Sequence, residues 1–151
     1  MKVKLLSSGA IRAGLRRCLW MAAWFFFVAP TVQAQISVIV ARSSAHTATQ
    51  AQVRDYFSGA KLHWSSGARV LVVDRPKTEI GEAFYKKLVG RSPAQVRVQW
   101  TKLVLSGQAP PPIKGMSEEE VKKLVSENPN AIGFIATSAL DDTVEELIRI
   151  E

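Results

Sequence analysis

The chain has 151 residues, with 20 Lys and Arg against 13 Asp and Glu, and a formal net charge of +7. Five of the basic residues and none of the acidic ones lie in residues 1–34, so residues 35–151 carry 15 basic and 13 acidic side chains, a net charge of +2. This near balance argues against a nucleic-acid-binding protein. The only cysteine, Cys18, also lies before residue 35, so the remainder can form neither a disulfide nor a thiolate metal site.

Residues 1–34 have the three parts of a secretory signal peptide. Basic residues are followed by the ten-residue apolar run Leu19 to Val28 and by small residues ending at Ala34. The apolar run is shorter than the roughly 20 residues of a membrane-spanning helix, which makes an uncleaved anchor the less favoured alternative. We expect a Sec-type leader cleaved after Ala34, a periplasmic location, and no stable membrane span after cleavage. Residues 35–151 are enough for one domain with one core.

In the first half of this domain, residues 36–40 (ISVIV) predict a strand, and residues 48–57 predict a helix that Ser58 and Gly59 end. A polar loop containing Ser43 and Ser44 lies between them. Residues 70–73 (VLVV) form a β-branched run typical of a strand buried on both faces.

A polar loop and a helix follow the strand at residues 70–73. Pro76 ends the strand, Thr78 can cap the helix, and apolar residues recur every four positions along one face to residue 88. Strand, loop and helix N-terminus form the geometry with which α/β proteins hold anions. Here the loop also carries Arg75 and Lys77.

In the second half, residues 94–105 fit both a helical stripe and a strand alternation, and the preceding Ser92 and Pro93 favour a helix. Residues 106–115, with three consecutive prolines, predict an extended crossing. Ser117 and Glu120 predict a capping box for a helix reaching about residue 127, and the acidic residues 118–120 are interpreted as a solvated cluster.

The chain then predicts a buried strand at residues 131–135 and a last strand or short helix at residues 144–150. Strands that alternate with helices indicate an α/β fold with a small mixed sheet flanked by helices.

Several passages, in this order, resemble the phosphate-type periplasmic substrate-binding proteins of ABC transporters. Residues 53–61 (VRDYFSGAK), followed by Trp64 and a Ser-Ser-Gly turn, are similar to that family's "IFxGK…W…G" passage. Residues 128–134 (NPNAIGF) are similar to its "NPGAIGY" strand. The resemblance covers about residues 36–150 and implies one lobe of a type II periplasmic binding protein, whereas the family has two lobes and holds its ligand between them.

The resemblance also implies an oxyanion site at helix N-termini, to which Ser43, Ser44, Arg75, Lys77 and Thr78 would contribute. Phosphate-binding members carry Ser-Gly-Thr at the start of the helix after the central strand, where this chain has Thr78, Glu79 and Ile80. A carboxylate at this position repels an anion by about 1–4 kcal/mol.

The residues do not predict an enzyme. The sequence has no nucleophilic elbow and no glycine-rich phosphate loop, and its two histidines, His46 and His63, are far apart in the sequence. Asp74 beside Arg75 is interpreted as a local ion pair, and Trp64 and Trp100 as core residues. We expect no catalytic residue, metal site or cofactor.

Two hypotheses about function follow. The first is an exported periplasmic protein that binds phosphate or a similar oxyanion for ABC-type uptake. The second is a single-lobe module that has kept the fold, binds no ligand, and acts through a periplasmic protein partner. In either case half a cleft implies weak affinity for a free anion, unless self-association or another protein closes it.

Overall fold

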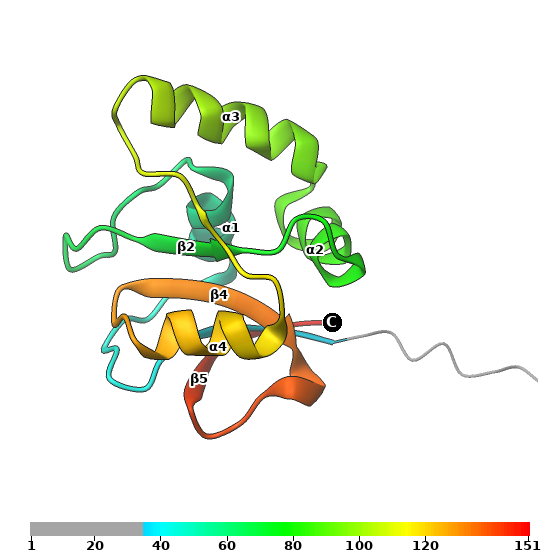
Figure 1. Ribbon diagram of the computed structural model, residues 1–151. Helices are drawn as coiled ribbons and strands as arrows, with labels where there is room; N and C mark the ends of the chain where they lie inside the picture. The colour runs from blue at the N-terminus through cyan, green and yellow to red at the C-terminus, as the bar shows by residue number, and fades with distance from the viewer. Residues whose placement is uncertain (1–34) are drawn as a thin grey trace, which may run out of the picture. The chain divides into compact units, whose positions relative to one another are not determined.

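A five-stranded mixed sheet organises residues 35–151, the part of the chain that the computed structural model describes (Figure 1). The strand order is β3-β2-β4-β1-β5. β2 is parallel to β3 and β4, whereas β1 is antiparallel to β4 and β5. The strands are β1 (Ile36–Ala41), β2 (Leu71–Asp74), β3 (Ile113–Lys114), β4 (Ala131–Ala136) and β5 (Val144–Ile150). The predicted α/β fold with a small mixed sheet is therefore confirmed.

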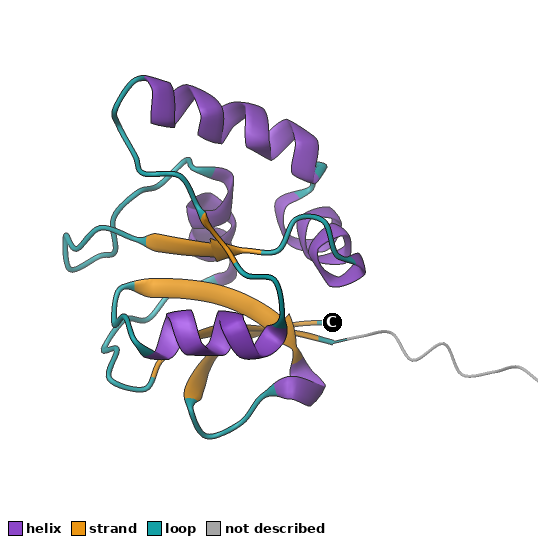
Figure 2. Ribbon diagram, viewed as in Figure 1, coloured by secondary structure: helices purple, strands orange, loops and turns teal. Residues whose placement is uncertain are grey.

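Three of the helices (Figure 2) begin directly after the residues that the sequence marks as caps. The side chains of Thr78, Ser92 and Ser117 each accept a backbone N–H from the first turn of the helix that follows. Glu120 accepts the N–H of Met116 instead of completing the predicted capping box with Ser117. The helical elements are α1 (Gln50–Ser58), α2 (Glu79–Phe84), the π-helical turn η1 (Tyr85–Val89), α3 (Pro93–Leu105), α4 (Glu118–Ser126) and the 3-10 turn η2 (Thr137–Ala139).

Two segments that the sequence left ambiguous are now assigned. Residues 94–105 lie in the helix α3, as the Ser-Pro start favours, and residues 144–150 form the strand β5. The proline-rich crossing contains a two-residue strand, β3, which the sequence did not predict.

Helices cover both faces of the sheet. Alternate residues of β4 show this, because Ile132 and Phe134 belong to the core cluster that contains residues of α1, η1 and α3. Ala131 and Ile135 belong instead to a smaller cluster with Val121 of α4. The sheet thus lies between α4 on one side and the other three helices on the other side.

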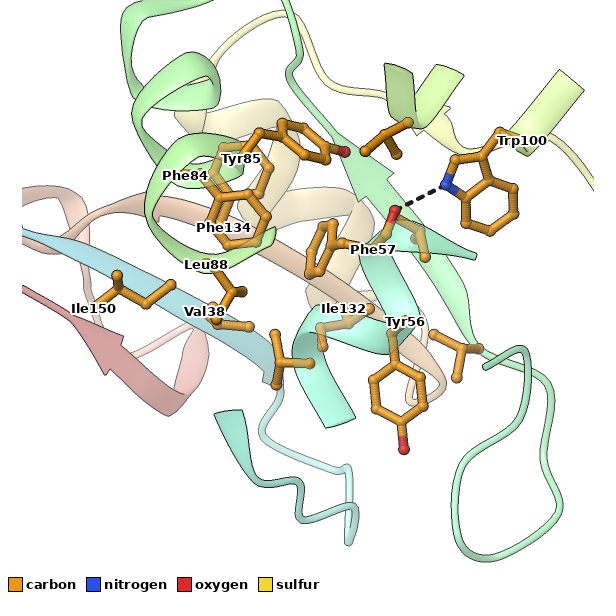
Figure 3. Close-up of a cluster of buried hydrophobic side chains, with 14 of the residues drawn as sticks. Val38, Tyr56, Phe57, Phe84, Tyr85, Leu88, Trp100, Ile132, Phe134 and Ile150 are labelled. Atoms are coloured by element: carbon orange, nitrogen blue, oxygen red, sulfur yellow. Dashed lines mark hydrogen bonds between the residues drawn. The ribbon is translucent and has the colours of Figure 1, made fainter. Parts of the chain in front are cut away.

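Aromatic rings fill the larger of these two clusters (Figure 3). The rings of Phe84 and Phe134 are stacked with their centroids 4.1 Å apart, and Phe57 meets the Phe84 ring edge to face at 4.6 Å. Trp100 Nε1 donates a hydrogen bond of 2.9 Å to the carbonyl of Phe57. This bond fixes α3 against α1 and sets the orientation of the Trp100 ring. Trp64 and Trp100 are 2% and 7% exposed, which confirms both as core residues.

Two predictions, the signal peptide and its cleavage after Ala34, concern residues before position 35. The signal peptide lies outside the described residues, and the boundary after Ala34 therefore stays a prediction. Within residues 35–151, no helix is long and apolar enough to cross a membrane.

The smaller cluster depends on a glycine in the middle of β4. A Cβ atom built on Gly133 would lie 2.9 Å from Val121 Cγ1 and 3.0 Å from Val125 Cγ2. We expect Gly133→Ala to lower the free energy of unfolding by about 1–3 kcal/mol, because α4 must move away from the sheet. Urea denaturation measures this, and an unchanged midpoint would show that α4 does not pack closely on β4.

Candidate functional site

A depression lined by the loop after β2 lies at the carboxyl end of that strand. Parallel strands end at the same edge of a sheet, and ligands of α/β proteins bind outside this edge. The pocket has a volume of about 500 Å³ and is bounded by the loop after β2, by α3 and by the crossing that contains β3. It is lined by Asp74, Arg75, Pro76, Lys77, Thr78, Pro93, Val96, Arg97, Trp100, Pro112, Lys114, Gly115 and Met116. We call it the β2 pocket.

The charged side chains of the β2 pocket are mostly basic. Arg75 and Lys77 come from the loop, Arg97 from α3 and Lys114 from β3, and Asp74 is the one carboxyl among the lining residues. Three of the cations, those of residues 77, 97 and 114, belong to exposed residues at the rim. The pocket therefore has the electrostatic character of an anion site.

Arg75 lies beside the pocket but is turned toward α4. Its side chain is only 10% exposed, and its Nη1 lies 3.5 Å from Glu118 Oε1. The same carboxylate oxygen accepts the backbone N–H of Ala136 at 2.8 Å. Two interpretations of the sequence are thus wrong. Arg75 forms an ion pair with Glu118 and not with Asp74. Glu118 is not a solvated charge, because it binds Arg75 and the backbone of Ala136.

Asp74 is a buried carboxyl at the floor of the pocket. It is 9% exposed, and its Oδ1 has no hydrogen-bond partner among the described residues. Burial raises the pKa of Asp74 to about 6, while the nearby Tyr85 hydroxyl, the backbone of Arg75 and the charges of Arg97 and Lys114 oppose the rise. The Tyr85 hydroxyl lies close to this carboxyl but forms no hydrogen bond of good geometry. Burial, and then the charge of Asp74, raise the pKa of Tyr85.

The Thr78 hydroxyl already forms two hydrogen bonds within the protein. Its hydroxyl accepts the N–H of Gly81 at 3.1 Å and donates to the carbonyl of Arg75 at 2.9 Å. Gly81 is required here because a Cβ atom at this position would lie 2.0 Å from the Arg75 carbonyl oxygen. The first turn of α2 also carries Glu79 and Glu82. The start of α2 is therefore a poor site for an anion, because its hydroxyl is already hydrogen-bonded and its first turn is acidic.

Ser43 and Ser44 do not belong to this site. β1 is antiparallel to β4 whereas β2 is parallel to it, so the carboxyl end of β1 lies at the opposite edge of the sheet from the β2 pocket. Ser44 lines a separate depression with His46 and Glu145, and its Oγ accepts the N–H of His46 at 3.2 Å. The structure therefore separates these two serines from the loop after β2, with which the sequence analysis had grouped them in one site.

The sequence reasoning missed Arg97 and Lys114. Arg97 follows Val96 and precedes Trp100 by three positions, which places it beside the buried face of α3. Lys114 reaches the pocket because β3 pairs with β2 and sets Lys114 opposite Asp74. The helical spacing of Arg97 relative to Val96 and Trp100 could have predicted its position beside the buried face of α3. Nothing in the proline-rich crossing predicts the pairing of β3.

A second, open depression continues from the β2 pocket between α2 and α3. It has a volume of about 720 Å³ and shares Lys77 and Arg97 with the β2 pocket. Lys86 and Arg91 add two further cations, against the single acidic residue Glu82. The basic surface thus extends well beyond the β2 pocket.

Comparison with profiles of known families and with curated proteins gives no match. Solved structures do match. A putative phosphate ABC transporter substrate-binding protein with bound phosphate from Clostridium perfringens is 24% identical, with a TM-score of 0.58. An ABC-type phosphate transport receptor from Vibrio cholerae is 20% identical with a TM-score of 0.51, and PstS from Borrelia burgdorferi is 16% identical with a TM-score of 0.52.

These matches cover 76%, 76% and 69% of the present chain but only 45%, 46% and 42% of the other chains. The chain thus spans slightly less than half the length of the proteins that it matches. It has the fold found in phosphate-type substrate-binding proteins, as the resemblance in the sequence implies, over an extent consistent with one lobe.

The buried carboxyl makes stability depend on pH. The folded-state pKa of Asp74, about 6, lies above its usual value of 3.8, so the folded protein binds the proton more tightly. The free energy of unfolding therefore falls as pH rises from about 4 to about 6, and the loss remains above pH 6.

We expect Asp74→Asn to be more stable than the parent protein by about 1–3 kcal/mol at pH 7.5, and equally stable near pH 4, because the amide stays neutral. Urea denaturation at both pH values measures this. A difference that does not change with pH would show that Asp74 titrates normally.

Proposed function

We propose that this protein is an exported periplasmic binding protein for phosphate or a similar oxyanion, associated with ABC-type uptake, and that the anion binds in the β2 pocket. The observation that carries the proposal is the charge of this pocket, because four of the five charged residues that line it are basic. The fold supports it, because one protein of the same fold is described with bound phosphate.

Side chains from three different elements would hold the anion. Lys77, Arg97 and Lys114 surround the mouth of the pocket, and guanidinium and ammonium groups form the strong charge-assisted hydrogen bonds that oxyanions accept. Their exposed ends are free to turn toward a ligand. Arg75 contributes less, since Glu118 already neutralises part of its charge.

Helix N-termini play a smaller part in this proposal than the sequence suggests. The hydroxyl of Thr78 and the N–H of Gly81 satisfy each other, and Glu79 and Glu82 place negative charge in the first turn of α2. Carboxylates at this position disfavour a second anion. The anion would therefore be held mainly by side chains at the mouth of the pocket.

The affinity of one such lobe for a free anion would be low. The β2 pocket opens to solvent at its mouth, and ligands are held tightly when most of their surface is buried. A second copy of the chain, another periplasmic protein or the membrane component of a transporter would supply the missing wall.

A ligand-free module that acts through a periplasmic protein partner is the second candidate. Two observations favour it: the Thr78 hydroxyl is occupied, and α3 exposes two large apolar side chains, Val98 at 58% and Leu105 at 83%. These two residues are seven positions apart and so lie on one face of α3, where a protein partner would cover both.

Calorimetric titration with inorganic phosphate separates the two candidates. For the purified protein at low ionic strength we expect saturable binding, which the double substitution Arg97→Gln and Lys114→Gln weakens by about tenfold or more, because two charge-assisted contacts are lost. Added salt should weaken binding as well, since the cations are exposed.

Lys102→Gln is the matched control, because Lys102 is an exposed cation of α3 that does not line the pocket. Absence of phosphate binding would favour the ligand-free module, whereas binding that the double substitution leaves unchanged would contradict the β2 pocket as the site.

A further inference from the structure

The inner wall of the β2 pocket is apolar. Val96 and Trp100, which are 2% and 7% exposed, form its α3 side, and Pro112 lines it from the crossing. Met116, which is 81% exposed, adds an apolar side chain at the rim. The hydrogen bond from Trp100 Nε1 to Phe57 holds the indole ring in place. A free inorganic anion makes no favourable contact with such a wall, whereas a hydrocarbon group does.

The pocket is also larger than a small inorganic ion requires. Its volume of about 500 Å³ falls within the roughly 300–1,000 Å³ of sites that bury drug-sized organic ligands. A ligand that fills it must therefore carry an organic group in addition to any anionic group.

The charges are arranged by depth. The cations of Lys77, Arg97 and Lys114 belong to exposed residues, whereas the carboxyl of Asp74 is buried with Oδ1 unpartnered. The fourth cation, Arg75, is also buried, but it forms an ion pair with Glu118. An anion at the floor would be repelled by Asp74, and an anion at the rim would be attracted by three cations. A hydrogen-bond donor on a neutral group would satisfy Asp74 Oδ1 at the floor.

We propose that the β2 pocket binds an organic phosphate or phosphonate, with its oxyanion between the rim cations and its hydrocarbon body against Val96 and Trp100 inside the pocket and against Met116 at the rim. This inference rests on the proposed oxyanion-binding function and names the class of its ligand. The hydrocarbon body distinguishes this ligand from inorganic phosphate.

Phenyl phosphate, inorganic phosphate and phenol are the three test ligands, each titrated into the purified protein by calorimetry. We expect phenyl phosphate to bind about tenfold or more tighter than inorganic phosphate, because its ring is buried against the apolar wall, and tighter than phenol, which lacks the anion.

Met116→Gln tests where the ring binds. Met116 is 81% exposed at the rim of the pocket, so the protein should tolerate this substitution. It should weaken phenyl phosphate about three- to fivefold and leave inorganic phosphate unchanged, because only the ring contacts this side chain. Leu105→Gln, an exposed apolar position of α3 that does not line the pocket, is the control and should change neither.

The outcomes distinguish this inference from the proposed function. Equal affinity for phenyl phosphate and inorganic phosphate, or an equal effect of Met116→Gln on both, would overturn the organic ligand and leave oxyanion binding intact. Binding of phenol as tight as that of phenyl phosphate would overturn the organic phosphate as ligand. Binding of none of the three ligands would overturn both proposals.

Discussion

The pairing of β3 with β2 is the contact on which the pocket depends. This ladder consists of two residue pairs, Val73 with Ile113 and Asp74 with Lys114, and it is extended by a hydrogen bond of 3.1 Å from Gly115 N–H to the Asp74 carbonyl. The short strand brings the crossing between α3 and α4 to the carboxyl end of β2. Without this short strand, only the loop after β2 and the inner side of α3 would line the site, and it would be open on the side that the crossing now covers.

The same pairing also creates an electrostatic conflict. It buries the carboxyl of Asp74 within a group of cations, none of which forms a salt bridge with it. Burial then outweighs the attraction of Arg97 and Lys114, and the pKa of Asp74 rises to about 6. Buried, unpaired titratable groups in a cleft are more frequent at functional sites than elsewhere, because a purely structural role would favour a neutral or paired side chain. This strengthens the case that the β2 pocket has a ligand.

The fold alone does not decide that ligand. Similar folds host different functions, and the functional conclusion must come from the side chains of the site. In this chain the usual place for an anion, the start of the helix after the central strand, is closed by the Thr78 hydroxyl and carries Glu79. Positive charge is found instead on α3 and β3, and the same pocket is lined by the apolar side chains of Val96 and Trp100. These are substantial differences within a shared architecture.

The sequence by itself determined most of the elements, β3 excepted, and the general class of the fold. The caps Thr78, Ser92 and Ser117 act through hydrogen bonds within one turn, and the apolar periods of strands and helices are equally local, so both can be read from neighbouring residues. The resemblance carried by residues 53–61 and 128–134 also identified the fold correctly.

Only the tertiary structure decided which residues share a site. The direction of β1 separated Ser43 and Ser44 from the loop after β2, and the ladder of β3 brought Lys114 to Asp74. Arg75 forms its ion pair with Glu118, more than forty positions along the chain, and not with its neighbour Asp74. Strand direction, ladder register and ion pairing between distant segments depend on the packing of the whole sheet, and local sequence patterns do not encode them.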